Sequence, residues 1–208
     1  MPRNKDGPKS EVSRRGFLST MGVGAASVAA ASQVSAETSK TKIAVADEKV
    51  SVTLDVNGQQ YRHMVEPRWS LAYVLREELH ITGTKVVCER GECGACTVLI
   101  DDKPRYSCMT LAVEAQGSQI VTVEGLMAGE EIGEVQQAFI EEDGMQCGYC
   151  TSGQIMSVEG LLRENPNPTR GDVAKQVSGN LCRCGAYPHI LSAGERAARL
   201  KRGEGGAS

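Results

Sequence analysis

Apolar and polar residues alternate along residues 49–65, and this alternation predicts two β-strands joined by a tight turn. The apolar positions of the first strand are Val50, Val52, Leu54 and Val56. Asn57-Gly58 follows them. This pair is the strongest short hairpin signal because a type I′ turn needs positive φ at both of its central positions. The sequence therefore predicts a β-hairpin whose second strand covers residues 59–65.

The spacing then becomes helical and returns to alternation. The apolar stripe of the predicted helix is Leu71, Val74, Leu75 and Leu79. Ser70 stands just before it and is a residue type that caps helices well. Residues 97–100 and those from 105 onward predict a second hairpin around a turn at 101–104, and residues 119–124 predict a last strand. Residues 48–125 are therefore expected to form an α+β domain in which a small sheet grips one helix.

Residues 126–200 show helical spacing instead, and four helices are predicted there. The first covers residues 131–142 and includes Ile132 in its apolar stripe; the second covers residues 152–163. Thr169, three positions before Asp172, opens the third like a capping box. The fourth runs over residues 188–201 with a proline in its first turn. We expect an all-α domain over 126–200 and a disordered tail over 201–208.

Composition limits what this 208-residue chain can do. Hydrophobic residues make up 40% and charged residues 24%, which is ordinary for a globular protein, but aromatic residues make up only 4%. The cores should therefore be aliphatic and modest, with the eight cysteines helping to hold them. The net charge of −3 gives no sign of a nucleic-acid surface. A chain this short has no room for a large substrate-binding domain, which indicates a subunit.

The first four cysteines have the C-x4-C-x2-C-x11-C spacing of plant-type ferredoxins, which bind a 2Fe–2S cluster. They are Cys88, Cys93, Cys96 and Cys108. Gly91 and Gly94 can adopt backbone conformations that curl the loop, and their lack of side chains lets N–H groups approach the cluster. A disulfide scaffold or a zinc site is the alternative for these cysteines.

The last four cysteines follow a C-x2-C-x31-C-x1-C pattern and are placed in two loops at helix ends. They are Cys147, Cys150, Cys182 and Cys184. C-x-C is unfavourable for a zinc ribbon, which prefers C-x2-C pairs, and also for a disulfide. A lone C-x2-C redox motif would need a βαβ context that is missing. The spacing therefore favours a second 2Fe–2S cluster.

The N-terminus has the pattern of a twin-arginine export signal. Arg14-Arg15 is followed by Phe17-Leu18, then by an apolar stretch too weak for a membrane span, and by small residues at 34–36. We expect residues 1–36 to be a signal peptide, residues 37–47 a linker, and the protein to be periplasmic. The lysine usual after Phe-Leu is absent, and the alternative is a disordered basic tail. Because this route exports folded proteins, clusters can be inserted before export.

Three motifs together resemble the small iron–sulfur subunit of the xanthine oxidase family of molybdenum hydroxylases. They are Gly83-Thr84-Lys85 before the first cysteine loop, Gln146-Cys147-Gly148-Tyr149-Cys150, and Gly179-Asn180-Leu181-Cys182-Arg183-Cys184-Gly185 with Tyr187. The export signal makes the chain most similar to the iron–sulfur subunit of periplasmic aldehyde oxidoreductases. The resemblance implies a β-grasp, ferredoxin-like domain followed by a four-helix domain, with one 2Fe–2S cluster in each.

The resemblance also implies partners. A large subunit would bind molybdopterin and oxidise the substrate, and a flavin subunit carrying FAD, or a cytochrome carrying haem, would accept the electrons. In the family, the cluster of the helical domain lies beside the pterin. The residues that contact the pterin correspond to Gln146 and Cys184 here. As an alternative, Gln146 caps a helix end.

Two other functions stay open from the sequence. One is a free-standing periplasmic electron carrier, although a soluble ferredoxin needs only the first domain. The other is a disulfide-stapled secreted binding module, although Gly-rich cysteine loops suit cluster binding better. No catalytic constellation is found on the chain, and the substrate class, whether aldehyde, N-heteroaromatic or purine, is left undetermined.

Overall fold

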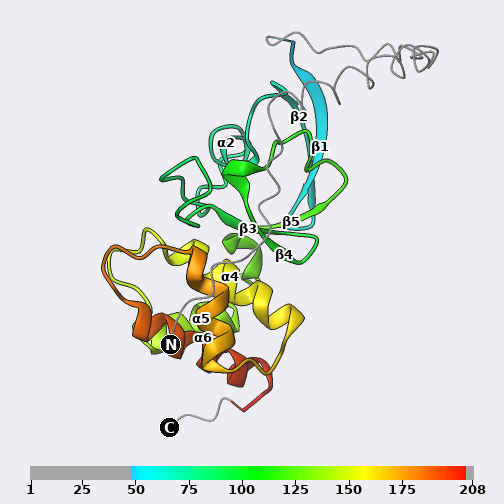
Figure 1. The fold of residues 1–208 in the computed structure, drawn as a ribbon. Helices are drawn as coiled ribbons and strands as arrows, with labels where there is room; N and C mark the ends of the chain where they lie inside the picture. The colour runs from blue at the N-terminus through cyan, green and yellow to red at the C-terminus, as the bar shows by residue number, and fades with distance from the viewer. Residues whose placement is uncertain (1–47, 205–208) are drawn as a thin grey trace, which may run out of the picture. The chain divides into compact units, whose positions relative to one another are not determined.

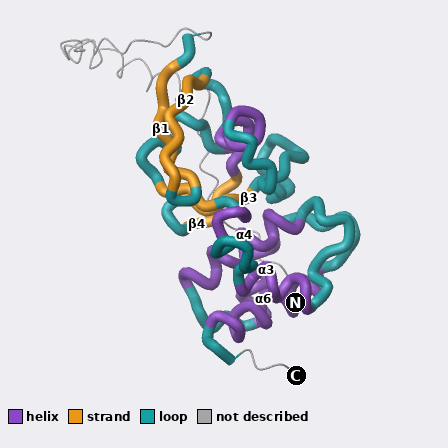
Figure 2. The backbone as a smooth tube through the Cα atoms, turned by 180° about the vertical axis from the view of Figure 1, so that it is seen from behind, coloured by secondary structure: helices purple, strands orange, loops and turns teal. Residues whose placement is uncertain are grey.

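The structure is a computed structural model that describes residues 48–204. The predicted signal peptide and linker and the end of the predicted tail lie outside the described residues. All described residues belong to one compact unit, Ala44–Ser208. Figure 2 shows the strands and the helices α3, α4 and α6 gathered in separate regions of this unit. Among residues 48–204, every helix is too short or too polar to cross a lipid bilayer.

Five strands form one mixed sheet in the order β2-β1-β5-β3-β4. They are β1 Val50–Val56, β2 Gln59–Val65, β3 Thr97–Ile100, β4 Lys103–Tyr106 and β5 Gln119–Val121. β1 pairs with β5 in parallel, and the other pairs are antiparallel (Figure 1). β5 lies between β1 and β3 and so joins the first hairpin to the second in a single sheet.

The first hairpin confirms the prediction from the alternating pattern. Asn57 and Gly58 have φ values of 55° and 76°, as a type I′ turn requires. Val56 pairs with Gln59 across this two-residue loop. Val52, Leu54 and Val56 are buried on one face of β1. Burial of this face fixes the register, because a shift by one residue would expose all of them.

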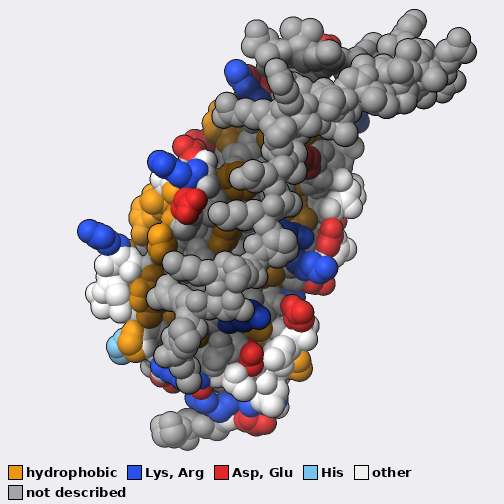
Figure 3. Space-filling model, in the orientation of Figure 1, with side chains coloured by type: hydrophobic (Ala, Val, Ile, Leu, Met, Phe, Trp, Pro, Cys, Tyr) orange, Lys and Arg blue, Asp and Glu red, His pale blue; other side chains and the backbone are white. Residues whose placement is uncertain are grey.

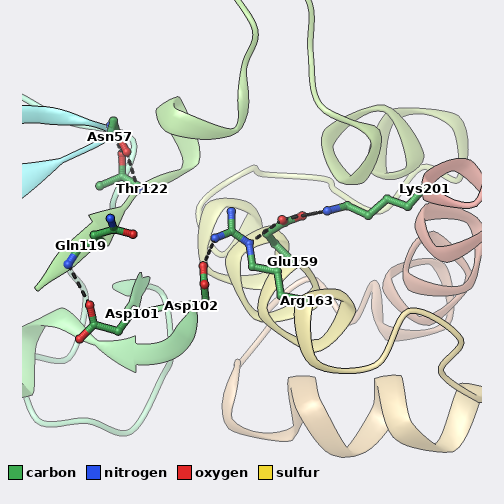
Figure 4. Close-up of polar contacts among 8 residues, drawn as sticks. All are labelled: Asn57, Asp101, Asp102, Gln119, Thr122, Glu159, Arg163 and Lys201. Atoms are coloured by element: carbon green, nitrogen blue, oxygen red, sulfur yellow. Dashed lines mark hydrogen bonds and ion pairs between the residues drawn. The ribbon is translucent and has the colours of Figure 1, made fainter.

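The second hairpin and the last strand differ from their predicted bounds. The predicted turn at 101–104 was wrong: Asp101 and Asp102 alone make it, with φ of 49° and 65°. β4 therefore already contains Pro104, which is tolerated because β4 is an edge strand. β5 ends at Val121 because Thr122 bonds a side chain instead, donating its N–H to Asn57 Oδ1 at 2.9 Å (Figure 4). A 3-10 helix, Val123–Leu126, replaces the end of the predicted strand.

The predicted helix after Ser70 is confirmed, although its second half is wider than an α-helix. Ser70 Oγ accepts a hydrogen bond from Tyr73 N–H at 3.2 Å and so caps α2, Leu71–Tyr73. The chain continues as a π-helix over Val74–Glu78. The buried members of its apolar stripe pack with the sheet in one core. They are Leu71, Val74 and Leu75.

Four α-helices follow in the described chain after residue 133. They are α3 Glu134–Glu141, α4 Thr151–Glu164, α5 Arg170–Gln176 and α6 Tyr187–Lys201. The predicted start of the first of these at residue 131 was wrong. Gly133 caps α3, and Ile132 stays outside it, 45% exposed. The capping box at Thr169 is confirmed, since its Oγ1 accepts from Asp172 N–H. Phe139 and Ile190 lie in the core of this half.

α4 packs directly on the second hairpin and joins the two halves. Gly160 faces β3 and β4, and a Cβ at this position would lie 2.6 Å from Pro104 Cδ. One turn further, Arg163 pairs with both Glu159 and Asp102 (Figure 4). Glu159 is only 5% exposed and also binds Lys201 Nζ at 2.8 Å. A buried carboxylate with two cationic partners thus lies where the hairpin turn meets α4 and α6.

Gly160→Ala should destabilise the protein although alanine favours helices. The gain in helix propensity is about 1 kcal/mol, but overpacking against Pro104 and Leu99 costs about 1–3 kcal/mol. Denaturant unfolding would measure the change in the free energy of unfolding. Gly171→Ala is the matched control, since the new Cβ would meet only Thr169 Oγ1 at 3.6 Å. It should be neutral or stabilising; equal losses for both variants would contradict the close packing of α4 on the hairpin.

Candidate metal centres

Three of the four cysteines of the first set lie on a tightly curled loop between the π-helix and β3. Gly91 and Gly94 both have positive φ, 76° and 68°, which confirms the curled backbone expected of them. Cys88 and Cys93 are partly buried, and Cys96 is buried. Cys108 comes from a 3-10 helix after β4. Ser107 anchors this helix to the loop, because its hydroxyl donates to Cys96 O at 2.7 Å.

The four thiols of this set are grouped as two pairs. Cys88 lies beside Cys93 and Cys96 lies beside Cys108, close enough for each thiol to affect the pKa of its neighbour. The backbone N–H of Arg90 lowers the pKa of Cys88 to about 7. Burial, in contrast, raises the pKa of Cys96 to about 12. The loop therefore has both an N–H group that stabilises a thiolate and a dry interior.

The second cysteine set comes from two loops that precede helices. Cys147 and Cys150 stand just before α4, and Cys182 and Cys184 stand before α6. Cys147 lies beside Cys184 and Cys150 lies beside Cys182, close enough for the thiols to affect each other's pKa, so each pair takes one member from each loop. Burial raises the pKa of Cys150 to about 12. Cys147 and Cys184 are exposed, so one pair faces the surface.

Pairs of thiols are the arrangement that a two-iron cluster requires. In a 2Fe–2S cluster with four thiolates, each iron takes two of them. All eight cysteines, each within the described residues, are free thiols. The donor chemistry and the pairing fit a 2Fe–2S cluster in each set better than zinc or a disulfide framework.

Gln146 lies where a partner could reach it. Its side chain is exposed, as is that of the neighbouring Cys147. The alternative role as a cap of α4 is not seen, since that helix begins after Cys150 without a side-chain cap.

The two cysteine sets are in direct contact, which the sequence did not indicate. Leu181 N–H donates to Cys93 O at 2.9 Å, so a backbone hydrogen bond joins the loop of one set to the loop of the other. Asn180 Nδ2 donates to Gly94 O at 2.9 Å beside it. Asn180 and Gly94 are 86 positions apart, and the sequence signalled Asn180 only as part of a motif. No spacing rule could have paired them.

An apolar cavity of about 470 Å³ opens between the two sets. Its cysteines come from both, Cys93 from the first and Cys147, Cys150 and Cys182 from the second. Exposed Tyr149 and Leu181 form part of its wall. Hydrophobic side chains also run along the left edge of the face drawn in Figure 3, where Figure 1 shows loops of both halves. The region around the sets is therefore low in polarity.

The fold and the paired thiols define a class, that of iron–sulfur proteins with two cluster sites. Comparison with known protein families supports this class. Residues 54–120 match a family described as a 2Fe-2S iron-sulfur cluster binding domain. Residues 122–195 match a second family, described as a 2Fe-2S binding domain. The mixed sheet and the helices thus confirm the predicted α+β class with one such domain after the other.

Similar proteins narrow the class to a family. The aldehyde oxidoreductase iron-sulfur-binding subunit PaoA of Escherichia coli (strain K12) is 45% identical over 168 residues, covering 74% of this chain and 73% of that protein. A probable xanthine dehydrogenase subunit of Bacillus subtilis (strain 168) is 45% identical over 154 residues, covering 74% and 87%. The chain belongs to the iron–sulfur subunits of the xanthine oxidase family of molybdenum hydroxylases.

Solved structures show the same relationship. A chain of quinoline 2-oxidoreductase from Pseudomonas putida 86 superposes with a TM-score of 0.71 at 44% identity, covering 76% of this chain and 99% of that one. The aldehyde oxidoreductase from Desulfovibrio gigas gives a TM-score of 0.71 at 38% identity, covering 74% of this chain and 17% of that one. In the second protein the matched part is thus a small portion of a much longer chain.

Gly94→Ala should damage the first site more than Gly148→Ala damages the second. Both glycines have positive φ, 68° and 81°, so alanine adds about 1–2 kcal/mol of backbone strain in each. Only Gly94 is also crowded, since a Cβ would lie 2.6 Å from Asn180 Nδ2 and Gly179 O. Overpacking there adds about 1–3 kcal/mol. Iron content and thermal unfolding of the two variants would measure the difference; equal effects would contradict the contact between the loops.

Proposed function

We propose that this chain carries electrons from a molybdopterin centre in a large subunit to a flavin subunit or a cytochrome. The proposal rests on the grouping of the eight free thiols into two sets, whose loops are joined by the Leu181–Cys93 hydrogen bond. When bound, 2Fe–2S clusters supply one-electron redox chemistry at potentials set by their hydrogen bonds and exposure. The chain's own residues would hold these groups close together.

Each half would hold one cluster. Within a β-grasp, ferredoxin-like domain the ligands would be Cys88, Cys93, Cys96 and Cys108. Within a domain of four helices they would be Cys147, Cys150, Cys182 and Cys184. Gly91 and Gly94 shape the first loop so that backbone N–H groups point at its sulfur atoms, as the N–H of Arg90 does toward Cys88. The N–H of Tyr149 likewise lowers the pKa of Cys147.

The large subunit would dock where the second set is exposed. Cys147 and Cys184 reach the surface there, and Gln146 stands beside them. The family resemblance assigns Gln146 and Cys184 to contacts with the pterin, and their exposure supports this assignment. By contrast, Cys96 of the first set is buried, so the first set is less accessible to a partner than the second.

The substrate would be an aldehyde, bound wholly on the large subunit. Similarity to PaoA at 45% identity supports this class. Relatives named for caffeine and nicotine show that the family also includes subunits of enzymes for N-heteroaromatic substrates. The choice between these classes would rest with the partner subunit.

The location we propose is the periplasm. It rests on the twin-arginine pattern at Arg14-Arg15, which lies outside the described residues. Folding before export explains how a chain with eight free thiols can receive clusters in the reducing cytoplasm and keep them afterwards.

The purified protein should contain about four irons and four acid-labile sulfides per chain. Cys108→Ser and Cys182→Ser should each remove about two irons, because each breaks one set, and the double variant should lose all four. Iron and sulfide analysis with visible absorption would measure this. Zinc in place of iron, or disulfides among these cysteines, would contradict the assignment. Failure of a molybdenum-containing large subunit to co-purify would favour a free-standing electron carrier instead.

Arg14→Lys together with Arg15→Lys should leave a folded, cluster-loaded protein in the cytoplasm. The twin-arginine route requires the arginine pair, whereas folding depends on residues that follow the signal. Cell fractionation with antibody detection would measure the distribution. Arg3→Lys is the matched control because it lies in the same basic segment outside the pair. Unchanged delivery of the double variant to the periplasm would rule out the signal.

A further inference from the structure

Asn180 is buried in the loop that leads into the second cysteine set, with only 2% of its surface exposed. Its side-chain Nδ2 donates hydrogen bonds to Gly94 O at 2.9 Å and to Thr97 Oγ1 at 3.2 Å. Its Oδ1 accepts a hydrogen bond from Ser157 Oγ at 2.9 Å. The carboxamide thus uses both donor hydrogens on the first half of the protein and its acceptor on α4.

The partners of Asn180 belong to the ligand loops themselves. Gly94 directly follows Cys93, and Thr97 directly follows Cys96. On the other side, Cys182 lies two positions after Asn180. The backbone of Asn180 is held as well, since its carbonyl accepts from Gln154 Nε2 at 2.9 Å. The Asn180 side chain, two positions from Cys182, therefore binds two residues that directly follow cysteines of the first set.

The Asn180 side chain is tightly packed. A Cβ on Gly94 would lie 2.6 Å from Asn180 Nδ2, so the loop approaches as closely as a glycine permits. Ser157 is 2% exposed and aims its hydroxyl at the amide oxygen. Because every polar atom of the carboxamide is paired in a buried site, any shift of one loop against the other breaks at least one hydrogen bond.

We propose that Asn180 is a positioning residue that fixes the separation and orientation of the two cysteine sets. The proposal rests on the proposed function, because a chain that passes electrons between two centres needs a constant distance between them. Removal of the carboxamide leaves Gly94 O and Thr97 Oγ1 without this donor and lets the loops take several spacings. The eight thiols are untouched, so both sets can still be loaded.

Electron paramagnetic resonance of the full chain in its complex, reduced with dithionite, tests this role. Two reduced clusters are paramagnetic, and their magnetic interaction splits the signals according to distance and orientation. Asn180→Ala should retain both signals and the wild-type iron content but lose the resolved splitting, which should become a broad distribution. Val173→Ala is the matched control, because it truncates a fully buried side chain in the helical core that is not among the hydrogen-bond partners of Asn180. It should lower the unfolding temperature while leaving the splitting unchanged.

An Asn180→Ala protein with both signals and the wild-type splitting would overturn the proposal. If this variant fails to fold, Thr97→Val decides the question, since it removes one acceptor of Nδ2 and also the hydrogen bond from the Thr97 hydroxyl to Gly94 O. Partial loss of the splitting would support the proposal, and an unchanged splitting would overturn it. A wild-type chain with one signal or none would contradict the proposed function itself, which keeps the two failures distinguishable.

Discussion

The contact between the two cysteine loops is the constraint on which the rest of this structure depends. Leu181 N–H donates to Cys93 O, and the buried side chain of Asn180 donates to Gly94 O, so one backbone hydrogen bond and one carboxamide join the two loops. Such an approach needs a glycine at position 94 and a loop that is itself anchored. The sheet anchors one loop through Thr97 at the start of β3, and α4 anchors the other through Gln154. The sheet and α4 thus hold in place the residues that make this contact.

A second connection holds the same halves together at the far end of α4. Glu159 is buried, and its carboxylate is paired with Arg163 and Lys201, while Arg163 also reaches Asp102 in the β3–β4 turn (Figure 4). A buried carboxylate is costly to desolvate, so such a group contributes more to a unique arrangement than to net stability. With Gly160 between the two connections, α4 is fixed against the hairpin along most of its length. Rigid supports of this kind keep the cysteine sets from moving independently.

Much of this could be predicted from the sequence, and the remainder has identifiable causes. Asn57-Gly58, Ser70 and Thr169 determine local conformation through their own backbones and side chains, so the hairpin, the helix start and the capping box were predictable. One error arose where a distant partner decides the outcome, since Thr122 leaves the strand because Asn57 binds it. Another has a local cause, since α3 starts late because Gly133 occupies its N-cap position. Cysteine spacing indicated the ligands, but only the fold shows that the two sets touch, since Asn180 and Gly94 are far apart in sequence.

Amide hydrogen exchange at Leu181, in the loaded full-length protein, tests the central claim that the two halves form one unit joined at the cysteine loops. Leu181 has a side chain that is 55% exposed and lies in a loop, so an independent loop would exchange its amide rapidly. We expect instead that this amide is protected as strongly as that of Leu54 in the buried β1 strand, because both are released only by global unfolding. Rapid exchange at Leu181 with full protection at Leu54 would contradict it.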